Sequence, residues 1–119
     1  MGNRPSSRFG FGVVISDEPF EESEEPGSPC RLYAWGEKDE GGVEIIRGGY
    51  YENGHFLLVV AASASASDDW SPQAITPEQV AATPEWSAII EAYLDRWNLR
   101  GRVVEGFEKP GFLHSPYYG

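Results

Sequence analysis

Six carboxylates stand within nine residues of this chain, in the run DEPFEESEE that spans 17–25. They are Asp17, Glu18, Glu21, Glu22, Glu24 and Glu25. No lysine or arginine interrupts the run, which contributes more than half of a net charge of −10. Carboxylates at this density attract cations and basic proteins. Phe20, in the middle of the run, adds an apolar side chain for a pocket in a partner. The run therefore predicts a protein-binding segment; the competing interpretation is a solvated loop.

A second set of chemically capable residues is spread over the chain. His55 or His114 can serve as a general base if a carboxylate orients the ring, and Asp68 and Asp69 follow a predicted strand, where functional groups often stand. Trp70 comes next and is a candidate second contact for a partner. The simpler interpretation of Asp68 and Asp69 is a capped loop.

The motifs of common enzyme and metal sites are missing from the sequence. There is no G-x-S-x-G nucleophile turn, no phosphate-binding loop and no dinucleotide-binding glycine pattern. Cys30 is the only cysteine, and the two histidines lack the spacing of a metal site. We therefore expect no catalytic residue, no metal and no cofactor.

Composition narrows the choice of partner and compartment. A sequence pI near 4.5 disfavours direct binding to nucleic acid or to an anionic membrane surface. No apolar run approaches the roughly 20 residues that span a bilayer. A single cysteine suits the reducing cytoplasm. Arginine outnumbers lysine and glycine and proline are frequent, which is typical of a GC-rich bacterial or phage genome.

The hydrophobic pattern predicts five strands and one main helix. Alternation marks a strand at 8–16, and a run that is apolar on both faces marks a central strand at 55–62. Shorter segments at 30–35 and 43–47 resemble a hairpin, and 102–107 resembles a last strand.

Helix signals are concentrated between the last two strands. Thr76-Pro77-Glu78-Gln79 has the pattern of a capping box, and Thr83-Pro84-Glu85 repeats the start. The positions that follow have helical spacing up to Trp97, and Gly101 is the predicted stop. The apolar residues of that face are Trp86, Ile89, Ile90, Tyr93, Leu94 and Trp97.

The predicted fold is a single α+β domain over 1–119. Its antiparallel sheet has about five strands, namely a meander of four, then the helix, then a strand, with the helix packed on one face. Residues 1–7 are expected to be flexible and 17–29 to form an acidic loop. The aromatic tail at 108–119 is expected to pack on its own domain or on a second copy of the chain.

We hypothesise a non-catalytic, cytoplasmic protein-binding module, such as an inhibitor or immunity-type protein that binds a basic target. One alternative is a small enzyme or ligand-binding domain that uses His114 or His55 with Asp68 or Asp69. The other is a structural or assembly subunit that forms a homo-oligomer through the aromatic tail.

Overall fold

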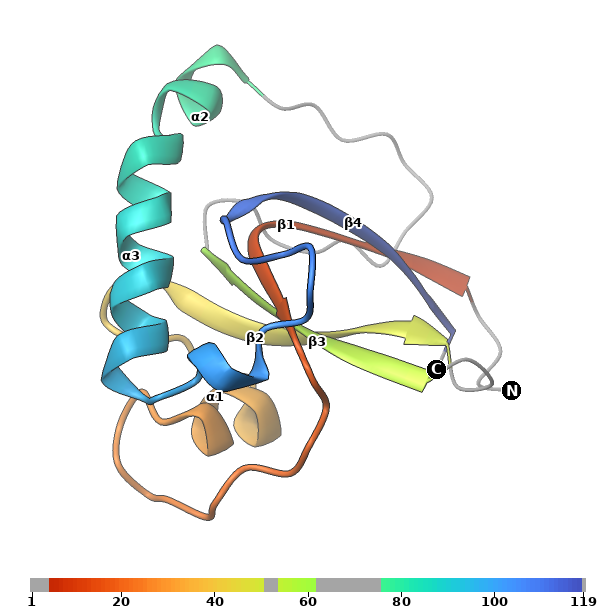
Figure 1. Ribbon diagram of the computed structural model, residues 1–119, viewed down its shortest axis with the longest axis vertical. Helices are drawn as coiled ribbons and strands as arrows, with labels where there is room; N and C mark the ends of the chain where they lie inside the picture. Colours follow the sequence, from red (N-terminus) through yellow and green to blue (C-terminus); the bar gives the residue numbers. More distant parts are fainter. Residues whose placement is uncertain (1–4, 51–53, 62–75, 119) are drawn as a thin grey trace.

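The computed structural model describes residues 5–50, 54–61 and 76–118, and these form four strands and three α-helices (Figure 1). The strands are β1 (Pro5–Ile15), β2 (Val43–Tyr50), β3 (Gly54–Ala61) and β4 (Gly111–Tyr118). The helices are α1 (Pro29–Trp35), α2 (Pro77–Ala81) and α3 (Thr83–Arg96), and a 3-10 helix, η2, covers Arg100–Arg102. The predicted α+β class, with a mainly antiparallel sheet, is confirmed; the fifth strand is not found within the described residues. Nor does any helix there have the length and apolar character needed to cross a membrane.

The strands close into a small barrel in the order β1-β3-β2-β4. β1 pairs antiparallel with both β3 and β4, and its pairing with β4 runs from Pro5 opposite Tyr118 to Gly12 opposite Gly111. A two-residue parallel contact between β2 and β4 completes the circle. The predicted meander is therefore wrong, because β1 lies beside β3 and β4 rather than beside the next segment in the chain.

The two faces of the sheet pack into different clusters. Phe11, Val13 and Ile15 of β1 join the main core with residues of α1 and α3, as the alternating pattern predicted. Val14 and Val60 pack with Leu113 in a smaller cluster on the other face. At Gly12, a Cβ atom would lie only 1.8 Å from the carbonyl oxygen of Val59 on β3, so this strand pair needs glycine there.

The segment 30–35, which we expected to be a strand, is helix α1. Ser28 is its N-cap, since the hydroxyl accepts a hydrogen bond from the N–H of Arg31 at 3.3 Å, and Pro29 occupies the first turn. Gly36 ends the helix in the left-handed conformation, at φ 66°. The helical form buries Leu32 completely against the core, and this burial together with the caps outweighs the local strand pattern.

The expected strand at 102–107 is also wrong. η2 ends at Arg102, and Val103 forms a single bridge with Ile15 before the chain turns at Gly106, which has φ 98°. The last strand lies instead within the predicted tail, as β4. At the other end of the sheet, β1 begins at Pro5, so 5–7 belong to a strand rather than to a flexible end. Residues 1–4 lie outside the described part.

α3 confirms the strongest helix prediction, with Trp86, Ile90, Tyr93 and Leu94 buried on one face. It ends at Arg96, before the predicted stop at Gly101. Asn98 takes a left-handed φ of 55°, and the N–H of Leu99 donates to the carbonyl of Leu94 at 2.8 Å. This is a Schellman ending with asparagine in the position that glycine usually takes.

Candidate functional site

The acidic run lies in the loop that joins β1 to α1, and one arginine holds the start of this loop on the domain. Arg102 donates from Nη1 to the carbonyl of Glu18 at 2.6 Å and from Nη2 to the carbonyl of Pro19 at 2.9 Å. Its guanidinium carbon lies 4.7 Å from the centre of the Phe20 ring, a cation–π contact. Phe20 in turn packs against Tyr33 and the main core. The apolar side chain of the run therefore fastens the loop to its own domain.

The end of the loop is fastened by buried groups. The hydroxyl of Tyr93, whose side chain is 2% exposed, donates to the carbonyl of Gly27 at 2.8 Å. Ser28 is buried, and its hydroxyl contacts the carbonyl of Ser23 at 3.4 Å as well as capping α1. Arg31 adds a hydrogen bond from Nη1 to the carbonyl of Glu24 at 3.3 Å. The loop is thus tied to the domain at both ends.

These anchors bind the backbone of the loop and leave its carboxylates exposed. Asp17, Glu18, Glu21, Glu22, Glu24 and Glu25 are all exposed, and none forms an ion pair with another described residue. Carboxylates elsewhere do find partners. A hydrogen bond from Arg31 lowers the pKa of Glu37, and one from Arg100 lowers the pKa of Asp95. The loop carboxylates are therefore held in place without an ion pair to another described residue, and the guanidinium groups of Arg31 and Arg102 bind the loop backbone instead.

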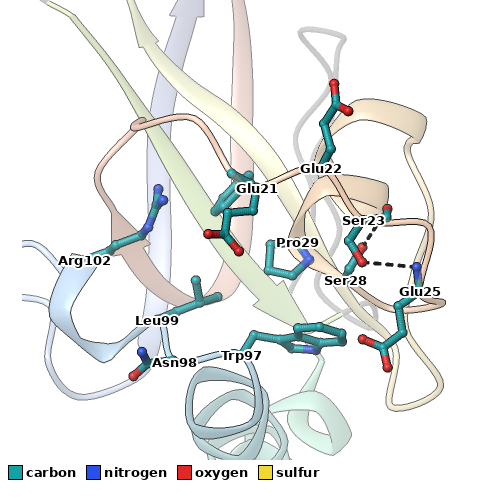
Figure 2. Close-up of a pocket in the computed structure, with 11 residues that line it drawn as sticks. Glu21, Glu22, Ser23, Glu25, Ser28, Pro29, Trp97, Asn98, Leu99 and Arg102 are labelled. Carbon is teal, nitrogen blue, oxygen red and sulfur yellow. Dashed lines mark hydrogen bonds between the residues drawn. The ribbon is translucent and has the colours of Figure 1, made fainter.

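A cleft of about 550 Å³ runs between this loop and the end of α3 (Figure 2). Phe20, Glu21, Glu22, Ser23, Glu25, Ser28, Pro29, Trp97, Asn98, Leu99 and Arg102 line it. Glu21 points into the cleft, whereas Glu22 points away from it (Figure 2). The half-buried ring of Trp97 forms part of the wall. Glu21 and Glu25 supply two carboxylates against the one guanidinium of Arg102, which donates to the loop backbone, so the cleft favours a positively charged occupant.

A second cleft of about 330 Å³ lies on the other side of the turn at 25–28. Its lining includes Glu25, which also lines the first cleft, together with residues 37–40 and Arg96. Arg96 and Glu40 form an exposed ion pair there at 3.5 Å. Glu25 therefore stands at the boundary between the two clefts.

The structure brings together only part of the predicted site. Phe20, Glu21, Glu22 and Glu25 share the first cleft, whereas Asp17, Glu18 and Glu24 lie on the loop outside its lining. Asp68, Asp69 and Trp70 lie outside the described residues, as do the side chains of His55 and His114. Within the described part of the chain, no group of three histidine, cysteine, aspartate or glutamate residues is arranged to hold a metal ion.

Sequence reasoning missed the residues that shape the site. Arg102 and Tyr93 reach the loop from 83–84 and 66 positions away in the chain, so no local pattern relates them to it. The sequence pattern places Trp97 on the apolar face of α3 and gives no sign that it borders a cleft. Ser28 did carry a signal, because a serine before a proline is a common helix start.

No protein-family model matches the chain, and no curated protein or solved structure matches it significantly. The function is therefore inferred from the geometry and charge of the site.

Proposed function

We propose that this protein is a non-catalytic binding module that captures a basic partner protein through the acidic loop 17–25 and the cleft beside it. The observation that supports this most is that the loop is anchored through its backbone while its carboxylates stay exposed. Arg102, Arg31 and Tyr93 bind the loop backbone, while the loop carboxylates form no ion pair with another described residue. A segment needed only for solubility gains nothing from such fixation.

Fixation lowers the cost of binding, because a loop that is already ordered loses little conformational entropy when a partner arrives. The exposed carboxylates raise the rate of encounter with a basic surface. Inside the cleft, Glu21 can accept hydrogen bonds from a lysine or arginine of the partner, and the wall formed by Trp97 offers contact to its aliphatic stem. A module of this kind would cover a basic functional surface of its target, as an inhibitor or immunity-type protein does.

A matched pair of triple variants tests the role of the loop. E21Q/E22Q/E25Q removes three charges beside the cleft, and E78Q/E85Q/E105Q removes three exposed charges elsewhere, so the net charge is −7 in both. The probe is the nonapeptide RKRSSSRKR, and its affinity is measured by calorimetry at 0.05 and 0.5 M NaCl. Because each exposed ion pair contributes about 0.2–1 kcal/mol, the loss of three such pairs should weaken binding of the loop variant roughly 3- to 150-fold at low salt.

The control variant should lose less than about half as much binding free energy for the peptide as the loop variant does. This difference between the two variants should shrink at high salt. Equal losses in the two variants would mean that only total charge matters and would refute the proposed site.

Replacing Arg102 separates fixation from charge. Arg102→Met leaves every carboxylate in place and makes the protein more negative, but it removes both hydrogen bonds to the start of the loop. If fixation matters, the variant binds the peptide several-fold more weakly despite its extra negative charge. Tighter binding by Arg102→Met would contradict a preorganised site.

A further inference from the structure

The largest exposed apolar side chain among the described residues is Trp35, at the end of α1. It is 71% exposed, whereas Trp86 is buried and Trp97 half-buried. An indole ring in contact with water leaves a large apolar area unused, since a tryptophan can bury roughly 150–250 Å². Trp35 lines neither of the two clefts, so its exposure is a feature separate from them.

Trp35 is also held in position. The guanidinium carbon of Arg31 lies 5.4 Å from the centre of its ring. Arg31 is itself fixed by two hydrogen bonds to the carboxylate of Glu37, at 2.9 and 2.5 Å. Gly36 ends α1 directly after the tryptophan. The contact with Arg31 restricts the rotamers of the exposed ring, and an aromatic side chain that is already restricted loses less conformational freedom on binding.

The same arginine connects Trp35 to the acidic loop. Arg31 donates to the carbonyl of Glu24 while it contacts the indole ring, so the ring and the part of the loop around Glu24 lie on one surface (α1 and the preceding loop are adjacent in Figure 1). A partner drawn in by the carboxylates near Glu24 therefore meets Trp35 on the same surface.

We propose that Trp35 is the apolar anchor of the interface with the basic partner, and that the partner presents an apolar pocket rimmed by lysine or arginine. This inference rests on the proposed function and adds the chemistry of the partner surface. The negative charge of the loop disfavours a second copy of this chain as the partner at this surface. Joining two Trp35 surfaces would bring two acidic loops together, and like charges at an interface oppose association.

Two peptides distinguish the anchor from general charge attraction. RKRLLLRKR and RKRSSSRKR carry the same charge, and only the first offers apolar side chains to Trp35. We expect the wild-type protein to bind the leucine peptide about tenfold more tightly than the serine peptide. Trp35→Ala should abolish that preference and leave binding of the serine peptide within about twofold. Trp35→Phe should retain part of it, and Phe107→Ala, at a side chain 36% exposed outside the site, should retain all of it.

Other results overturn the assignment in distinguishable ways. An unchanged preference in Trp35→Ala would show that the ring is not the anchor, while the proposed function stands. Equal weakening of both peptides would assign the ring to cation stacking instead. Failure of the wild-type protein to bind either peptide at 0.05 M NaCl would remove the proposed function and the anchor together. A dimer in sedimentation equilibrium that Trp35→Ala abolishes would assign the surface to a second copy.

Discussion

Replacing Tyr93 with phenylalanine tests whether the end of the acidic loop is held by one buried hydroxyl. The change removes the 2.8 Å hydrogen bond to the carbonyl of Gly27 and keeps the ring in the core. Losing a partly buried hydrogen bond of this kind costs about 1–2 kcal/mol. For a chain of this length, 1.5 kcal/mol corresponds to a fall in Tm of roughly 4–9 °C.

The same hydroxyl gives the prediction a pH dependence. Burial, and to a lesser extent the nearby charge of Asp39, raises the pKa of Tyr93, while Arg96 opposes the shift. In the unfolded chain the phenol ionises near pH 10, whereas the folded protein retains the proton. Above pH 10 the unfolded state therefore binds fewer protons, and the stability of the wild-type protein falls by about 1.4 kcal/mol per pH unit.

Tyr93→Phe has no proton to lose at this position. Its deficit of about 1.5 kcal/mol at pH 7 should therefore shrink to almost nothing by about pH 11. Urea denaturation of both proteins at pH 7, 9, 10 and 11 measures the difference. Ile90→Val, in the same helix, is the matched control, because it removes no titratable group and its difference from wild type should stay constant with pH. A gap between wild type and Tyr93→Phe that does not change with pH would refute the reasoning.

Two further substitutions test the backbone that supports the site. Gly12→Ala would place a Cβ 1.8 Å from the carbonyl oxygen of Val59, and urea denaturation should show a loss of about 3 kcal/mol or more in the free energy of unfolding. Gly111→Ala, at the cross-strand partner of Gly12, has open space for the Cβ and should cost less than about 1 kcal/mol. Similar losses in the two variants would disprove the close approach at Gly12. Asn98→Ala, at the left-handed end of α3, should lower the free energy of unfolding by about 1 kcal/mol and lower the Tm. Asn98→Gly should change the free energy of unfolding by no more than about 0.3 kcal/mol. An alanine variant as stable as wild type would contradict the assigned φ.

The sequence allowed prediction of the elements whose pattern is local. α3 was predictable because its apolar residues recur at helical spacing after a proline start, and β1 and β3 because of alternation and a continuous apolar run. The segment RLYAW fits both the two-residue period of a strand and the 3.6-residue period of a helix, so the pattern alone suggested a strand. The N-cap Ser28 and the C-cap Gly36 favour the helix α1. β4 was hidden by Pro110 and Pro116, and its pairing with β1 links opposite ends of the chain, which no local pattern reveals.

The candidate site also has features that could be predicted from local sequence and features that depend on the fold. The position of the acidic run in a loop between elements was predictable from its composition. Its fixation was not, because Arg102 and Tyr93 come from parts of the chain that approach the loop only after folding. Trp35 carried no sequence signal either, because its exposure at the last residue of α1 becomes visible only once 29–35 is known to be a helix.

The pairing of β1 with β3 and β4 affects how the chain is made on the ribosome. β1 is synthesised before both of its partners, and one of these is the last strand of the described chain. Until β4 is made, the backbone groups of β1 that pair with it are open, and open strand edges are templates for association between nascent chains. The acidic run follows β1 directly, and charged residues beside an apolar strand act as gatekeepers against such association. We therefore expect the charge of this loop to protect β1 during synthesis, before any cleft has formed.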